Sequence, residues 1–343
     1  MPQHSRRLAD DVRGVPFVAM LLLALAMVAI LPGDAWAWTP GTHVYLGEAL
    51  LRSPSLLPTA IAELLRAFPY EFLYGSIAAD TSIAKKYAAA GRHCHSWTVG
   101  FEILDRARDE PLRAFSLGYL AHLAADVVAH NYFVPRQLAI TSTTVALGHS
   151  YWENRFETHL GERPARRARE LILLDHTRSD GHLDRILSPT IFSTPTNRRI
   201  FRGMVRVTDM ESWQRIFHLA SERSRWDLPN REVDQYLARS FDYIVDLLNR
   251  MDGAEPYAFD PAGDLRLRLA KRVRREALRV GGEERLREDA DRHFGLPASS
   301  LSHAAQLALP LVADAVATNG SAHSPAGEER DEPNDSSAPP AAG

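Results

Sequence analysis

The segment from Ala114 to Pro135, AFSLGYLAHLAADVVAHNYFVP, constrains the fold of this chain more than any other. It is long enough for a helix and mostly apolar, yet it carries His122, Asp126 and His130 at steps of four residues. At about 100° per residue, each of these side chains lies about 40° from the last, so all three would face the same interior point. Burying an ionised carboxylate requires a cation, and imidazole and carboxylate are donors that zinc prefers. A metal site and a hydrogen-bonded histidine–aspartate ladder both remain open.

The rest of the chain also predicts helices. From Leu46 onward, apolar residues recur at intervals of three and four, and the period-two alternation of strands is scarce. We therefore expect an all-α, multi-helical single domain, for which 343 residues, 45% of them hydrophobic, can supply one large core. The net charge of −3 argues against a global field for nucleic acid or an anionic surface, so any such affinity must be local.

The two ends of the chain differ from this domain. Three arginines precede an apolar run from Phe17 to Leu31, which is followed by a cleavage-type triplet at Ala35–Ala37. Residues 1–37 therefore predict a signal peptide, and the protein is expected to be exported, secreted or periplasmic, after cleavage near Ala37. An uncleaved anchor is the alternative, although the run is shorter than the roughly 20 residues that span a bilayer. Residues 38–318 would form the domain, and the acidic, proline-rich residues 319–343 predict a disordered tail.

Cleavage after Ala37 would give Trp38 a chemical role. Its free amine and its carbonyl oxygen could chelate one metal ion, and His43 could supply a third donor. An α-amino group with a pKa near 7.7–8.0 loses its proton readily to a cation. The indole would hold this new terminus in the core. Cys94 is the single cysteine, so the exported chain has no internal disulfide and would depend on its core or on metal.

A second donor group lies in GHSYWENRFETH, where His149 and Glu153 stand four residues apart with Glu157 and His159 behind them. One such pair is also common on solvated helix faces.

A third donor group combines Asp80, in YGSIAADTS, with His93 and His95, in GRHCHSW. Asp80 could instead cap a helix, and the histidines could be polar loop groups. Cys94 between them is interpreted as a packing residue rather than a ligand.

Together these motifs, from Trp38 to His159, resemble the zinc-dependent phospholipase C family, whose relatives include the fungal single-strand-specific nucleases. The resemblance implies an all-α phosphodiesterase with up to three zinc ions, in which metal-activated water attacks phosphorus. It assigns Asp80, His95, His122 and Asp126 to the first zinc, His130, His149 and Glu153 to the second, and Trp38, His43 and again Asp126 to the third. It also makes Asp80 a candidate general base.

The resemblance leaves several alternatives. The steps from Trp38 to His43 and from Asp80 to His95 match nuclease-type spacing, whereas Glu153 is similar to the phospholipase branch. The family places its later histidine farther along than the eight residues that separate His122 from His130. His159 or Glu157 could therefore replace His130, and His93 could replace His95.

The substrate is less constrained. The segment Asp264–Val280 predicts a helix with cationic side chains and an apolar stripe of Leu265, Leu269, Val273, Ala277 and Val280. Such a helix could contact anionic lipid head groups transiently, follow a nucleic-acid backbone, or pack on the core and leave a solvated basic face.

Aromatic residues near the ligands, Tyr132, Phe133, Tyr151 and Trp152, could stack nucleic-acid bases or belong to the core. The expected function is a phospholipase C-like hydrolase acting on phospholipid or another phosphodiester. The alternatives are a single-strand nuclease or 3'-nucleotidase, with nucleic acid as substrate, and a non-catalytic zinc-stabilised envelope protein.

Overall fold

The computed structural model describes residues 38–82, 87–88, 92–141, 145–208 and 226–307. Their regular structure is entirely helical, with no strand in these ranges, which confirms the all-α prediction. The predicted signal peptide and the predicted tail lie outside the described residues. The α-helices are α3 (Pro40–Leu51), α4 (Thr59–Ala67), α5 (Pro69–Ala78), α6 (Trp97–Asp105), α7 (Glu110–Val128), α8 (Val134–Thr141), α9 (Val145–Thr158), α10 (Glu162–Ile172), α11 (Thr177–Asp184), α12 (Thr194–Thr208), α14 (Asn230–Arg250), α15 (Asp264–Val280) and α16 (Gly282–Phe294).

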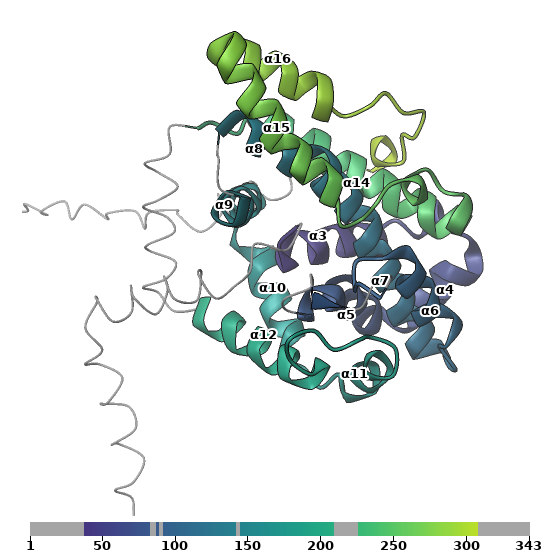
Figure 1. The fold of residues 1–343 in the computed structure, drawn as a ribbon. Helices are drawn as coiled ribbons and strands as arrows, with labels where there is room; N and C mark the ends of the chain where they lie inside the picture. Colours follow the sequence, from purple (N-terminus) through teal and green to yellow (C-terminus); the bar gives the residue numbers. More distant parts are fainter. Residues whose placement is uncertain (1–37, 83–86, 89–91, 142–144, 209–225, 308–343) are drawn as a thin grey trace, which may run out of the picture.

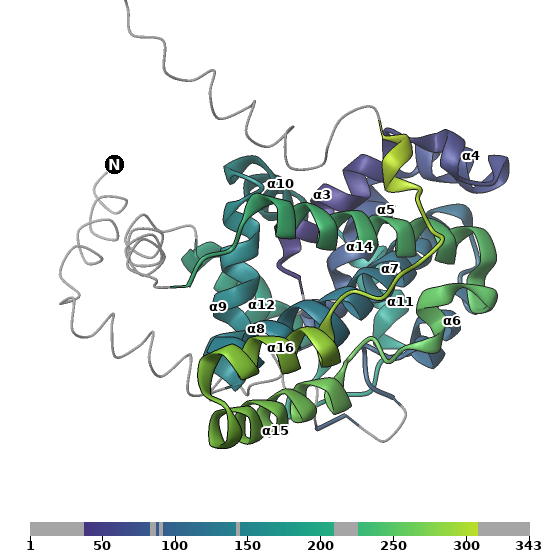
Figure 2. The same cartoon turned by 90° about the horizontal axis from the view of Figure 1, so that it is seen from above.

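Helix α7 is the core element. It begins where the Asp109 side chain accepts a hydrogen bond from the Leu112 backbone N–H at 3.0 Å. The whole stretch Glu110–Thr141 is long and apolar enough to span a membrane, but 94% of its most apolar window is buried inside the protein. A helix that is apolar on every side belongs in a core, and α5, α6 and α14 pack against α7 here. Figures 1 and 2 show this arrangement.

Two glycines allow α5 and α7 to cross closely. A Cβ on Gly75 would lie 2.0 Å from the Phe115 carbonyl oxygen, and a Cβ on Gly118 would lie 2.0 Å from the Phe72 carbonyl oxygen. Any side chain at either position would force the two helices apart. The 3₁₀ turn η3 (Ala79–Thr81) follows α5 directly, and its Asp80 Oδ1 lies 3.9 Å from His122 Nε2 on α7.

Helix α7 continues into a π-helical turn, η5 (Ala129–Phe133), before α8. Such turns insert a residue into a helix and are frequent at functional sites. Asn131 donates a side-chain hydrogen bond to the Val127 carbonyl at 3.0 Å and another to the Asp260 carbonyl at 2.8 Å. The turn is thereby joined to the loop that precedes α15.

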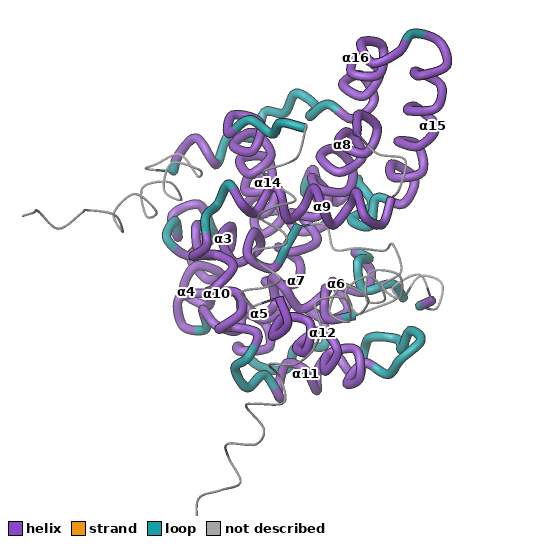
Figure 3. The backbone as a smooth tube through the Cα atoms, turned by 90° about the vertical axis from the view of Figure 1, so that its left-hand side faces the viewer, coloured by secondary structure: helices purple, strands orange, loops and turns teal. Residues whose placement is uncertain are grey.

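Helices α8, α15 and α16 gather at one end of the molecule, and α11 and α12 lie at the other (Figures 1 and 3). The stripe expected on α15 is partly wrong: Val273 and Ala277 are buried, but Leu265 and Val280 are 74% and 69% exposed. Ala270 is buried instead. The buried face is set by the side on which α16 and α8 pack, and the apolar pattern of α15 alone did not identify that side.

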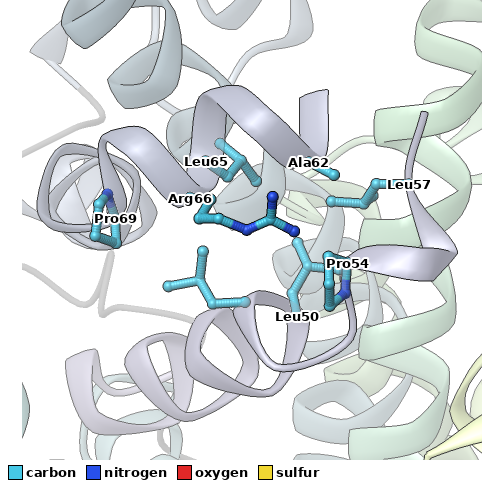
Figure 4. A pocket seen from close by; sticks show the side chains of 8 residues that line it. Leu50, Pro54, Leu57, Ala62, Leu65, Arg66 and Pro69 are labelled. Atoms are coloured by element: carbon cyan, nitrogen blue, oxygen red, sulfur yellow. The ribbon is translucent and has the colours of Figure 1, made fainter. Parts of the chain in front are cut away.

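A small apolar cavity of about 180 Å³ lies between the end of α3 and helix α4 (Figure 4). Leu50, Leu57 and Leu65 line it, and the Arg66 side chain extends across it. None of the candidate ligands lines this cavity.

Candidate metal centre

Five candidate donors from four segments meet beside α7. His43 comes from α3, Asp80 from η3 and His95 from the segment before α6, while His122 and Asp126 come from α7 itself. Each of the five side chains is at most 2% exposed. The crossing of α5 on α7 places Asp80, and the interpretation of Asp80 as a simple helix cap does not fit its place in the η3 turn.

Four of these donors lie within reach of the same histidine nitrogens. His95 Nε2 and His122 Nε2 lie 3.1 Å apart, and each lies 3.0 Å from Asp126 Oδ2. Asp80 Oδ1 lies 3.4 Å from His95 Nε2 and 3.9 Å from His122 Nε2. Tetrahedral zinc with bonds of about 2.0–2.2 Å separates its ligands by roughly 3.3–3.6 Å. The spacing of His95, His122 and Asp126 is close to what one zinc ion requires, and Asp80 lies near the two histidines of that group.

The hydrogen bonding of His122 also favours a cation. Its Nδ1 lies 2.9 Å from the Ser76 carbonyl oxygen, which can only accept, so Nδ1 carries a proton. In the neutral ring, Nε2 then presents a lone pair toward the Asp126 carboxylate. Two lone pairs 3.0 Å apart repel, and a cation between them removes the repulsion.

His43 completes this group on the other side of Asp126. Its Nε2 lies 3.2 Å from Asp126 Oδ1, and its ring stacks on His122 with centroids 4.0 Å apart. Burial, together with the neighbouring His122 imidazole, lowers the pKa of His43 despite Asp126. A neutral imidazole is the form that binds metal.

Asp126 stays ionised in this surrounding. Burial by itself would raise its pKa, but the neighbouring imidazoles, first His122 and then His43 and His95, hold the pKa well below its ordinary value. Its two oxygens face different neighbours, His43 on one side and the pair His95 and His122 on the other. Asp126 therefore has the geometry of a carboxylate shared between two metal positions.

A second cluster forms where the π-helical turn faces α9. The donor atoms of His130, His149 and Glu153 lie within 4.8 Å of one another, and all three side chains are buried. His149 Nε2 lies 2.8 Å from Glu153 Oε1. His130 Nδ1 lies 2.6 Å from the Pro261 carbonyl oxygen, so the proton is on Nδ1 and Nε2 is left for a ligand.

The expectation that His122, Asp126 and His130 face one interior point is wrong. His122 and Asp126 join the first cluster, whereas His130 joins the second. The ring centroids of His95 and His130 are 6.2 Å apart, so the two clusters are neighbours. The cumulative rotation along the helix turns His130 away from His122, toward α9.

The alternative ligands have other partners. His159 is 2.7 Å from the Asn230 side-chain oxygen, outside both clusters. The carboxylate of Glu157 accepts hydrogen bonds from the backbone N–H groups of Gly41 and Thr42 at the start of α3. His93 accepts a hydrogen bond from the His95 N–H through Nδ1 at 3.0 Å. His93 also forms a possible donor group with Cys94 and His95, and Cys94 Sγ lies 3.2 Å from His95 Nδ1.

Trp38 is fully buried next to the first cluster. Its indole Nε1 lies 3.1 Å from the Ala125 carbonyl oxygen and 3.3 Å from Ser240 Oγ. The ring packs against Phe133 and Phe156, with centroids 5.2 and 4.1 Å away. The indole thus holds residue 38 beside the residue that precedes Asp126.

Sequence reasoning missed the groups that orient the ligands. The carbonyls of Ser76 and Pro261 fix the histidine tautomers, and the Glu157 carboxylate holds the start of the helix that carries His43. Backbone carbonyls have no sequence signature. The DPAGD loop around Pro261 was visible only as a break between helices.

Residues 42–195 match the family described as zinc dependent phospholipase C. This region belongs to that family. The matched range contains every candidate ligand except Trp38 and extends beyond His159. No curated protein matches the chain, and no solved structure matches it either.

Zinc is the cofactor that the family and the donor set both support. The clusters consist of buried imidazole nitrogens and carboxylate oxygens, which are donors that zinc sites in proteins use. The two oxygens of Asp126 and the separate cluster at His149 leave room for more than one ion, up to the three that the resemblance implies.

Proposed function

We propose that this chain is an exported zinc-dependent phosphodiester hydrolase of the phospholipase C type, and that phospholipid is its preferred substrate. The observation that carries the proposal is the close grouping of His95, His122 and Asp126, with Asp80 beside the two histidines, next to a second donor cluster. A single structural zinc would need only one such group. Neighbouring metal positions are typical of phosphoryl chemistry.

Bound zinc ions would supply Lewis-acid activation of water and stabilisation of the charge that develops on phosphate oxygens. The chain's own residues hold the ions and set their spacing. Asp126 keeps the two sides of the first cluster together, and the Ser76 and Pro261 carbonyls hold His122 and His130 in the tautomer that leaves Nε2 available. Because every ligand is buried, their positions are fixed before substrate arrives.

Asp80 is the residue that we propose as general base. A carboxylate beside the reacting water can take its proton as the water oxygen forms a bond to phosphorus. The bond from phosphorus to the leaving alcohol oxygen then breaks, and that oxygen takes up a proton. Asp80 would hold the proton at a carboxylate oxygen and could return it to the leaving group.

A nuclease activity has less support. Single-strand nucleases bind bases by stacking them on accessible aromatic rings. Of the candidates near the ligands, Phe133 and Trp152 are at most 1% exposed and Tyr132 is 4% exposed. These rings belong to the core, and Tyr151 alone among the four is partly accessible.

Export is part of the same proposal, because a free Trp38 amine requires cleavage after Ala37. The buried indole of Trp38 supports it, since the ring holds that residue next to Asp126. The N-terminus of the mature protein, read by mass spectrometry from the exported fraction, tests this step directly.

The decisive experiment measures zinc per chain and turnover on the same purified sample. Substrates would be phosphatidylcholine, single-stranded DNA and a 3'-nucleotide. We expect more than one zinc per chain and release of phosphocholine, lost on chelation and restored by zinc. His159→Asn, outside both clusters, is the matched control and should keep both zinc and turnover.

Other outcomes would overturn the proposal. Turnover of single-stranded DNA alone would identify a nuclease. Stable zinc without turnover of any phosphodiester would identify a structural zinc protein. Asp80→Asn separates these roles further, because loss of turnover that exceeds any loss of zinc is expected only if Asp80 takes part in the chemistry.

A further inference from the structure

Helix α15 presents a cationic face to solvent. Its exposed side carries a row of basic residues, namely Arg268, Lys271, Arg272, Arg275 and Arg279. On a helix these five positions fall within about 100° of one another, opposite the buried residues Ala270, Val273 and Ala277. Two exposed acids of α15, Asp264 and Glu276, leave this side of the helix with an excess of positive charge.

These five charges have no ion-pair partner within the part of the chain that the structure describes. By contrast, Arg136 pairs with Glu232 and Asp291, and Arg198 pairs with Asp184. Acidic residues of α16 follow the turn after α15, where Asp289 is itself paired with Arg285 and Arg292. A face that is cationic without internal partners can attract an external anion.

Apolar side chains surround the cations on the same helix. Leu265 is 74% exposed, Leu278 43% and Val280 69%. A face with exposed arginines and exposed aliphatic side chains suits a membrane interface, where cations meet head groups and aliphatic chains enter the acyl boundary. Single-stranded nucleic acid would instead require aromatic side chains for stacking, and α15 contains none.

The helix begins next to the candidate metal centre. The Pro261 carbonyl accepts from His130 Nδ1 at 2.6 Å, and a Cβ on Gly263 would lie 2.5 Å from the His130 Cβ. Gly263 has φ +61°, so both its backbone and its surroundings require glycine. At 1.5 Å per residue the 17 residues of α15 span about 25 Å. A membrane held on this face would therefore lie near the second cluster.

We propose that the exposed face of α15 docks this protein onto an anionic phospholipid membrane. The partner is the bilayer surface itself, bound through its anionic head groups and its upper acyl region. The inference deepens the proposed phospholipase function and rests on it, because docking would deliver lipid substrate beside the metal centre.

The test measures binding to vesicles in the absence of turnover. Zinc-loaded wild-type protein is sedimented in the cold, in incubations too short for measurable hydrolysis, with vesicles of phosphatidylcholine alone or with phosphatidylglycerol added. We expect binding to the mixed vesicles that weakens with salt. Since each basic side chain near an anionic surface contributes roughly fivefold, R268Q/R272Q/R275Q should lower the partition coefficient by at least about tenfold.

The matched control removes the same charge from elsewhere. R108Q/R113Q/R166Q also loses three exposed arginines but leaves α15 intact, so it should bind like the wild type. L265S/L278S should weaken binding in a way that salt does not alter. Equal thermal melting of all variants excludes misfolding as the cause.

Equal vesicle binding by both triple variants, or no binding by the wild type, would overturn the docking surface. Binding of single-stranded DNA that depends on α15, without vesicle binding, would identify nucleic acid as the partner instead. Hydrolysis of a short-chain, monomeric phosphatidylcholine reports on the metal centre alone. If that reaction persists while docking fails, only the docking inference is lost, and if it is absent, the proposed function fails.

Discussion

The two metal clusters are built in different ways. The first takes its donors from four segments between His43 and Asp126, and all of them converge on one α7 carboxylate. In the second cluster, two of the three donors lie on the same helix, because His149 and Glu153 are one turn apart on α9. Only His130 reaches it from another helix. The first cluster therefore depends on how helices pack, and the second depends mainly on one helix.

Metal binding at the two clusters should therefore affect the stability of the fold differently. A group whose donors come from several elements links those elements, so metal binding there should couple to the fold as a whole. Metal binding to a cluster whose donors lie mostly on one helix should affect the stability of the whole fold less. Glu157 connects the two clusters, because it lies on α9 and binds the backbone N–H groups at the start of α3, which carries His43.

The largest expected effect separates the clusters by metal content. Asp126→Asn removes the charge that both sides of the first cluster share, so it should release more zinc than His149→Ala, which affects the second cluster. Mass spectrometry of zinc per chain checks the ranking. His159→Asn should release none, and equal loss from Asp126→Asn and His159→Asn would contradict a bridging role.

Glu157 provides a pH test of the link between the clusters. Burial raises its pKa from 4.5 to about 7, against the opposing backbone hydrogen bonds from Thr42 and Gly41. A raised pKa stabilises the fold below the unfolded pKa, and this stability is lost as pH rises through the folded pKa. The free energy of unfolding of the wild type should therefore fall by about 3 kcal/mol between about pH 4.5 and 7, and this fall should be absent from Glu157→Gln.

The measurement is the free energy of unfolding at several pH values in the presence of chelator, so that metal binding does not contribute. The difference between wild type and Glu157→Gln isolates this carboxylate from the histidines. The wild type should lose stability relative to the variant as pH rises across that range. A pH-independent difference would show that the carboxylate stays ionised throughout.

Gly75→Ala tests the dependence of the first cluster on helix packing. The added Cβ would meet the Phe115 carbonyl at 2.0 Å, so α5 must move away from α7 and carry Asp80 with it. Overpacking of this kind costs about 1–3 kcal/mol. Zinc titration should show weaker binding at the first cluster and little change at the second. Gly181→Ala, where nothing lies within 4 Å of the added Cβ, is the control.

The smallest effect concerns the indole of Trp38. Trp38→Phe keeps an aromatic ring between Phe133 and Phe156 but removes the Nε1 donor to Ala125 and Ser240. Losing these hydrogen bonds should cost about 0.5–1.5 kcal/mol, visible as a lower melting temperature. A larger loss of zinc than of stability would show that the indole also orients the backbone of residue 38.

The π-helical turn explains why residue spacing alone could not establish whether His130 is a metal ligand. The step from His122 to His130 is shorter than the family pattern and made His130 doubtful as a ligand. In the structure His130 lies in η5, and its Nδ1 faces the Pro261 carbonyl, 131 residues away in the chain. The doubt could not be removed from the sequence, because the rotation of the ring depends on that distant contact.

The amino-acid pattern was enough to predict the helical class and the donors that lie one turn apart on the same helix. Those features follow from the 3.6-residue period, which acts on near neighbours along the chain. The His149 and Glu153 pair is of this kind, and so is the pair of His122 and Asp126.

Which donors from separate segments meet depends on how the helices pack in three dimensions. Asp80 reaches α7 because two glycines let helices cross closely, and the Ser76 and Pro261 carbonyls set the histidine tautomers. The exposed side of α15 was likewise decided by where α16 and α8 pack. These outcomes depend on close packing between segments distant in sequence, and the periodicity of one helix contains no information about them.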